Sequence, residues 1–113
     1  MPYNAVKQTT TVEEPGIVDY SHPPVIVTRQ MNPNVNTLQA GSIVMLTDTG
    51  IKKYVKPTDG SEVTILGITV EAYDKTNGNL VRVLRHGTVV KERLNATAEE
   101  IADCEAQNPI YAI

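Results

Sequence analysis

The sequence predicts a mainly β protein: a small barrel-like or sandwich-like body, one short C-terminal helix and an extended N-terminal arm. Three observations lead to this prediction. Short runs of β-favouring residues alternate with glycine-containing turns after residue 37. One capping-box pattern marks a helix near the end of the chain. Five of the seven prolines lie in the first 36 of the 113 residues, where they disfavour helices and central strands.

Residues 1–36 form the predicted arm. Its first half has too few apolar side chains to offset an ordering cost of about 1–2 kcal/mol per residue, so we expect disorder there in isolation. β-Favouring residues nevertheless recur along the whole arm. An arm of this kind is suited to adding a strand to the exposed sheet edge of another protein.

Residues 37–113 form the predicted body. Gly41–Leu46 and Ile51–Val55 are separated by a turn at residues 48–50, and we expect them to form a β-hairpin. Residues 63–73 give the longest strand pattern. The apolar residues change phase beside Gly67, which predicts a β-bulge there.

The rest of the body is predicted from its turn and capping residues. Asn77-Gly78 favours a tight type I′ turn that leads from the long strand into Leu80–Arg85. Thr97 and Glu100 have the spacing of a capping box, so we expect a helix near 98–107. Residues 110–113 are apolar and predict a short terminal strand or a segment packed on the body.

Composition limits the possible partners. The chain has a formal net charge of -3, which gives no general attraction to nucleic acid. No apolar run reaches the length of a membrane span, and the first residues do not have the pattern of a secretory signal. Cys104 is the only cysteine, so we expect neither an internal disulfide nor a thiolate zinc site.

No residue pattern predicts catalysis or a cofactor. His22 and His86 lie far apart in the sequence, and the paired acids at Glu13-Glu14 and Glu99-Glu100 fall in the arm and at the helix start. None of the serines lies in a nucleophile elbow; they are Ser21, Ser42 and Ser61. We therefore expect no enzyme activity and no bound metal.

A group of basic residues near the end of the body is the one candidate anion-binding feature. These residues are Arg82, Arg85, Lys91 and Arg93. No aromatic residues are interleaved with them, as they usually are on nucleic-acid-binding sheets. We interpret the group as a solvated strand face or a contact with an acidic protein.

The order of these segments resembles a known family. Leu38-x-Ala40-Gly41-x-Ile43-Val44 opens the body, and Ile65-Leu66-Gly67-Ile68 follows the hairpin. Then come the Val81–Val90 segment with its Arg85-His86-Gly87-Thr88-Val89, Leu94 and a short acidic helix. Together they resemble the head decoration proteins of lambda-type bacteriophages over most of residues 38–107. The Pro- and Asn-containing stretch at 15–36 is a departure, longer than in the shortest members.

The resemblance implies a β-tulip type of body and a structural role. Members of the family assemble as homotrimers on the outer surface of the expanded head, over local three-fold axes of the major capsid protein lattice, after synthesis in the host cytoplasm. Their N-terminal arm orders on the capsid and joins its sheet. The resemblance thus implies a capsid-stabilising cement protein without enzyme activity, direct nucleic-acid contact or a membrane partner.

On this interpretation the arm from Pro2 to Tyr20 is the main capsid-binding element. The side chains that we expect to anchor it are Tyr3, Val6, Val12, Ile17 and Val18. Three alternatives stay open: another virion part such as a tail or neck protein, a ligand-binding β-barrel module, and a small hydrolase that uses Ser42 or His86.

Overall fold

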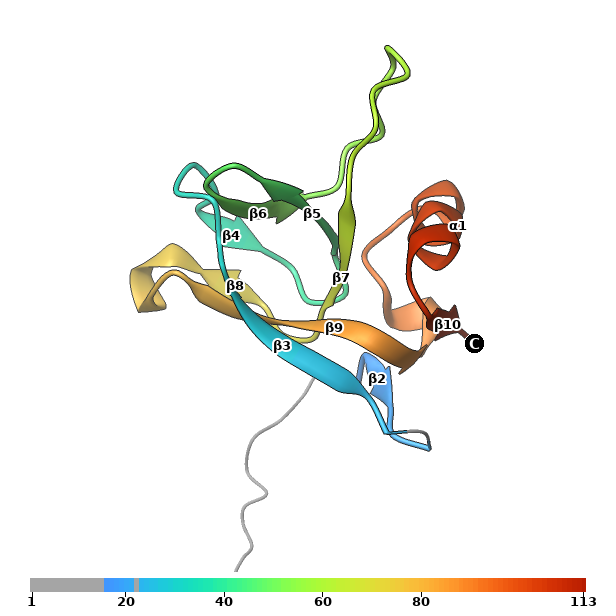
Figure 1. Cartoon of the computed structure of the whole chain (residues 1–113). Helices are drawn as coiled ribbons and strands as arrows, with labels where there is room; N and C mark the ends of the chain where they lie inside the picture. The colour runs from blue at the N-terminus through green and yellow to red at the C-terminus, as the bar shows by residue number, and fades with distance from the viewer. Residues whose placement is uncertain (1–15, 22) are drawn as a thin grey trace, which may run out of the picture.

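A computed structural model of the chain describes residues 16–21 and 23–113. Its strands are β2 (Val18–Asp19), β3 (Val25–Gln30), β4 (Thr37–Leu38), β5 (Ile43–Thr47), β6 (Gly50–Lys53), β7 (Ile65–Thr69), β8 (Tyr73–Asp74), β9 (Leu80–Val89) and β10 (Ile110–Ala112). Two 3₁₀ turns, η2 (Lys75–Asn77) and η3 (Lys91–Arg93), precede the helix α1 (Ala98–Gln107). The predicted mainly β class, with one C-terminal helix, is confirmed (Figure 1).

Strand β9 and four other strands form a small closed ring. Strand β9 pairs with β3 along one edge and with β7 along the other, and β7, β5 and β6 follow in order. An isolated bridge from Met31 to Ile51 then joins the end of β3 to β6 and closes the ring. Past the ring, β9 pairs with β2 and with β10, which runs parallel to it. The short β4–β8 ladder lies apart from the main sheet.

Two hydrophobic clusters lie on opposite faces of this sheet. The cluster inside the ring comprises Met31, Val44, Ile51, Leu66, Tyr73, Val81 and Val83. The cluster outside it, between the sheet and α1, includes Ile43, Ile65, Ile68, Leu84, Val89, Ile101, Cys104 and Ile110. All five residues of β7 are buried, because this strand lies between the two clusters.

The body begins well before residue 37. Ile17 and Val18 are only 2% and 7% exposed and belong to the cluster under α1. Met31, at 1% exposed, fills the ring interior, and β3 pairs with β9 over six residues. The expected boundary after residue 36 is therefore wrong for residues 16–36. The prolines bracket β2 and β3, and they do not prevent the residues between them from pairing.

Most of the predicted local structure is confirmed. Strands β5 and β6 form the expected hairpin. The β5–β7 register passes from Val44↔Gly67 to Met45↔Ile65, so Leu66 is the extra residue of the bulge predicted beside Gly67. Helix α1 spans the expected residues. Both bonds of its capping box are present: Glu100 N donates to Thr97 Oγ1 at 3.1 Å, and Thr97 N donates to Glu100 Oε1 at 2.9 Å.

The prediction of a type I′ turn at Asn77-Gly78 is wrong, because the chain does not form that turn. No non-glycine residue in the described part of the chain has a positive φ, which that turn requires at its first central position. The strand pattern of 63–73 breaks after Thr69, and Tyr73–Asp74 leaves to pair with β4. The Asp74 carboxylate then accepts bonds from Thr76 N and Oγ1, which stabilises η2 instead of a tight hairpin.

Gly50 is required where the ring closes. It has φ +143, and a Cβ there would lie 2.7 Å from the Gln30 carbonyl oxygen and 2.8 Å from Asn32 N. Gly60, with φ +79, has open space around it and provides a matched control. We expect Gly60→Ala to cost about 1–2 kcal/mol of unfolding free energy through backbone strain alone. Gly50→Ala should cost at least about 1 kcal/mol more, because main chain must move apart.

Urea denaturation of the two variants beside the native protein measures this difference. Equal losses of unfolding free energy would show that β3 does not press against Gly50.

Cys104 makes the stability of the fold sensitive to alkaline pH. Burial on the face of α1 that packs against the sheet raises the pKa of its thiol from 9.0 to about 12. The folded protein therefore keeps the thiol neutral where the unfolded chain ionises it, so this contribution is complete below pH 9 and is lost as pH rises toward 12. Between pH 8.5 and 10.5 the native protein should lose roughly 2 kcal/mol of unfolding free energy from this group.

Cys104→Ala is less stable at pH 8.5 because it leaves a cavity, but it should lack this part of the pH slope. Urea denaturation across the same pH range checks the difference in slope. Parallel pH profiles of the two proteins would contradict the assignment.

Candidate partner-binding surface

The structure divides the expected anchor residues into two groups. Tyr3, Val6 and Val12 lie outside the described residues. Val18 is the first residue of β2 and Ile17 directly precedes the strand, and the side chains of both pack in the body's own core. They are therefore core residues, and their side chains do not form an exposed contact with a partner. They fix the point at which the leading residues join the body.

This junction lies at one end of the sheet. Val90 N donates to Ile17 O at 2.8 Å, and Gly16 O accepts a 3.5 Å bond from Arg93 Nη1. Strands β2 and β3 lie on the same edge of β9 and run in the same direction, antiparallel to it. Traced backwards, β2 therefore points past Val90, away from β3 and from the ring.

Beside the junction, β2, β9 and β10 form a three-stranded layer with one uncovered face. Val18, Val89 and Ala112 share one row of the register, and Asp19, Thr88 and Tyr111 share the next. The first row packs toward α1. Because successive side chains alternate between faces, the second row points to the opposite face, away from the helix.

That opposite face is hollowed into a groove of about 420 Å³, which we call the terminal groove. It is lined by Asp19, Ser21, Gly87, Thr88, Pro109, Tyr111 and Ile113. Among the lining residues, Tyr111 and Ile113 are 64% and 65% exposed. Large apolar side chains gathered on one exposed surface are typical of a protein–protein contact. The apolar C-terminus was predicted either to form a short strand or to pack on the body, but no pattern in the sequence indicated that its alternate residues face outward.

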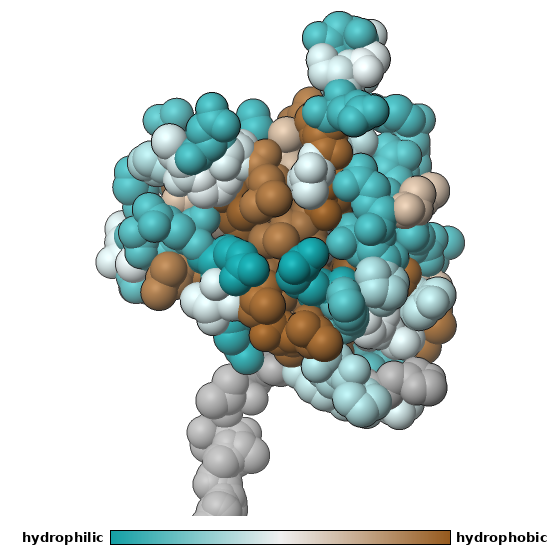
Figure 2. Space-filling model, viewed as in Figure 1, coloured by the Kyte–Doolittle hydropathy of each residue, from teal (hydrophilic) through white to brown (hydrophobic). Residues whose placement is uncertain are grey.

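Other apolar side chains are partly exposed between the ring and the helix. Figure 2 shows a hydrophobic band down the face that Figure 1 presents, with hydrophilic surface on both sides. Ile26, Met45 and Val63 are half-buried residues that border the cluster under α1. They come from β3, β5 and the segment that leads into β7.

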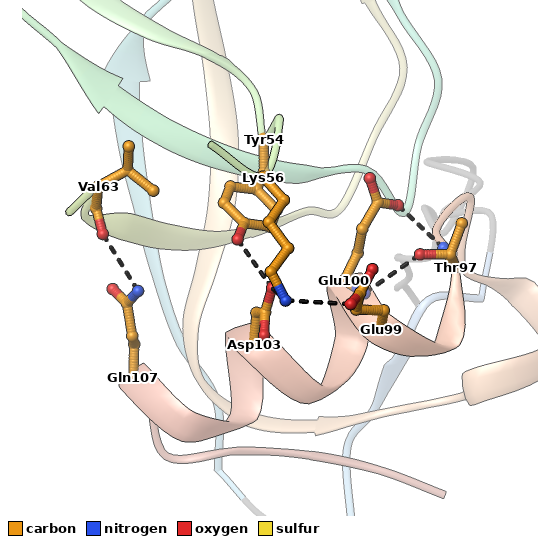
Figure 3. A network of polar contacts seen from close by, with 8 residues as sticks. All are labelled: Tyr54, Lys56, Val63, Thr97, Glu99, Glu100, Asp103 and Gln107. Atoms are coloured by element: carbon orange, nitrogen blue, oxygen red, sulfur yellow. Dashed lines mark hydrogen bonds and ion pairs between the residues drawn. The ribbon is translucent and has the colours of Figure 1, made fainter. Parts of the chain in front are cut away.

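A second cleft, of about 690 Å³, separates α1 from residues 54–64. Figure 3 shows the polar contacts that span it. Tyr54 Oη donates to Asp103 Oδ2 at 2.8 Å, and Lys56 Nζ donates to Glu99 Oε2 at 3.0 Å. Burial and then the bond to Asp103 raise the pKa of Tyr54, so its hydroxyl stays protonated as a donor. The contacts hold the segment against the helix.

The residues considered for catalysis do not form one site. Ser42 is buried and donates to Gln39 O at 2.7 Å, whereas His86 is exposed on β9. Arg82 Nε pairs with Glu71 Oε1 at 2.6 Å. Within residues 16–21 and 23–113, no three His, Cys, Asp or Glu side chains are grouped as metal ligands. The described residues thus show no arrangement that unites Ser42 with His86.

Comparisons with known proteins do not assign the chain to a family. No protein-family model matches it, and no curated protein matches its sequence. No helix among the described residues is long and apolar enough to cross a bilayer.

The Gln107 side chain, on α1, holds the C-terminal end of the 54–64 segment against the helix. Its side chain accepts from Ile65 N at 2.9 Å and donates to Val63 O at 3.1 Å. Gln107→Ala should cost about 1–2 kcal/mol of unfolding free energy and leave the segment less protected, because it removes two hydrogen bonds. Glu62→Ala, in the same segment, is the matched control.

Amide hydrogen exchange at Val63–Ile65 and urea denaturation together test this role. Unchanged exchange in Gln107→Ala would mean that packing alone holds the segment in place.

Proposed function

We propose that this chain is a capsid decoration protein of the lambda type, a trimeric cement that binds the outside of an expanded phage head. Residues 1–15 form its main attachment to the major capsid protein, by adding a strand to that protein's sheet. Of the anchors expected from the sequence, Tyr3, Val6 and Val12 keep this role. Ile17 and Val18 instead connect the attachment to the body.

One observation carries the proposal: the leading residues join the core itself beside an uncovered apolar groove. Ile17 and Val18 are buried under α1, and the next strand position, Asp19, opens onto the terminal groove. A partner that holds residues 1–15 would thus also meet Tyr111 and Ile113. Residues 1–15 and the terminal groove would then be two adjacent contacts on one body, which suits a protein that binds a surface.

Trimerisation adds the required affinity. Burying one Val or Tyr contributes about 1.5–3 kcal/mol, and ordering the main chain costs about 1–2 kcal/mol per residue, so one attachment is weak. Three attachments on a single trimer act at high effective concentration and bind far more tightly. The assembly is therefore part of the proposed binding mechanism.

The filled ring favours this function over a ligand-binding barrel. The interior holds Met31, Val44, Ile51 and Val83, each at most 1% exposed. A ligand-binding barrel needs an internal cavity with a few convergent polar groups. The two clefts described above lie outside the ring, against α1 and along β10. Another virion location, such as a tail or neck, would use the same surfaces, and electron microscopy of virions distinguishes these positions.

Deletion of residues 2–15 tests the attachment. The body should keep its thermal unfolding midpoint, because Ile17 and Val18 remain, but its occupancy on expanded heads should fall at least about tenfold through the lost avidity. Cosedimentation with undecorated heads, built from the major capsid protein of the same genome, measures occupancy. Unexpanded heads provide the reference surface.

Val6→Ser/Val12→Ser should weaken binding without shortening the segment, and Thr58→Ser, on the far 54–64 segment, is its control. Full occupancy by the deletion variant would refute the proposed attachment.

A further inference from the structure

Strand β3 is paired along one edge only over most of its length. All six of its residues are in register with β9. On the other side, contact with described residues begins near Gly50, at the bridge from Met31 to Ile51 and the 2.8 Å bond from Asn32 N to Ile51 O. In Figure 1, β3 crosses the near side of the body. The hydrophobic band in Figure 2 reaches this part of the surface.

The main-chain groups on this open side can be assigned from the register. Met31 N donates to Asn79 O at 2.8 Å, so Met31 faces the β9 side. Because hydrogen-bonding direction alternates along a strand, Val27 and Arg29 also face β9, whereas Ile26 and Thr28 face away. We call the outward main-chain groups of Ile26 and Thr28 the β3 edge.

The β3 edge has little of the protection that exposed strands usually carry. Among the described residues, its one assigned cover is the Arg29 side chain, whose Nη1 donates to Thr28 O at 3.2 Å. No proline or acidic residue interrupts Val25–Gln30, and Val25 is 46% exposed. Unpaired N–H and C=O groups in a row are complementary to another extended main chain. The chemistry of this edge therefore fits an extended peptide segment.

We propose that the β3 edge accepts residues 3–14 of a second copy of this chain. This segment lies between Pro2 and Pro15 and contains no proline, and it is rich in threonine and valine. It carries Glu13 and Glu14, which complement the exposed Arg29. Fully extended, twelve residues reach roughly 40 Å, enough to span the β3 edge of a neighbour.

The direction of β2 favours a neighbouring copy over the same chain. Traced backwards from Gly16, β2 leads away from its own β3, so pairing within one chain requires an immediate reversal of the segment. Pairing with a neighbour requires none. Each copy then gives one segment and receives another, an exchange that is compatible with a closed cyclic assembly such as a trimer. This inference concerns the free protein, and the segment must leave the β3 edge before it docks on a head.

Cross-linking of full-length proteins tests the pairing. Thr28→Cys, carrying a size tag, is mixed with Thr10→Cys or Thr11→Cys, adjacent positions that face opposite sides of an extended strand. Cys104 is fully buried and does not compete for the reagent. A bismaleimide should give the mixed dimer, at least about fivefold more than when Ala102→Cys on α1 replaces Thr28→Cys.

Three results would overturn the proposal. A mixed-dimer yield equal to that of the Ala102→Cys control means that the segment does not reach the β3 edge. Cross-linking confined to single chains of the Thr10→Cys/Thr28→Cys double variant places the segment on its own body. A dominant dimer between two Thr28→Cys chains means that two β3 edges pair with each other.

A charge exchange gives a second, independent measurement. Arg29→Glu should reduce self-association in sedimentation velocity about threefold, the effect of replacing one exposed attraction by a repulsion. Glu13→Lys/Glu14→Lys in the same chain should restore it. Lys53→Glu, an exposed reversal on β6, is the control for net charge. Loss without restoration, or no loss, would count against the pairing. Head binding is measured separately, so its failure and the failure of this pairing are distinguishable.

Discussion

The fold depends on β9, one strand that pairs with four others. Its first half pairs with β3 and β7 in the ring, and its second half pairs with β2 and β10. The bulge at Arg85, skipped between the pairs Val25↔His86 and Ile26↔Leu84, separates the two halves. The extra residue reverses which side chains face α1, so Leu84 and Val89 both pack in the same cluster although their numbers differ in parity. The outer face of the ring and the β2–β9–β10 layer thus pack in one hydrophobic cluster under α1.

This arrangement explains which features were predictable from sequence. The hairpin, the Gly67 bulge and the capping box are each set by neighbouring residues, and the structure has all three. The prediction of a tight turn at Asn77-Gly78 was wrong because Asp74, three residues before Asn77, accepts a local hydrogen bond from Thr76 instead. The boundary at residue 36 was wrong because burial of Ile17 and Met31 depends on pairing with β9, which begins only at Leu80, far along the chain. Local sequence contains no measure of such distant pairing.

The candidate partner-binding surface also has parts that were predictable from local sequence and parts that depend on distant pairing. A leading segment with β-forming residues was recognisable from composition, and its attachment to the head stays a proposal. The terminal groove was not recognisable, because the outward direction of Tyr111 follows from its register with Thr88 and Asp19. Ile17 and Val18 had the same apolar character as the other expected anchors. Only their position beside β9 makes them core residues, and that position fixes where the leading segment joins the body.

The 54–64 segment has a practical consequence. In Figure 1 it projects from the body at the end remote from β2 and β10, and a Cβ added to Gly60 near its tip would meet no other group within 4 Å. Both ends of the segment are hydrogen-bonded to α1, one through Lys56 and the other through Gln107. A foreign peptide inserted at this tip would thus be displayed at a distance from both proposed contact surfaces, whereas one fused after Ile113 would crowd the groove.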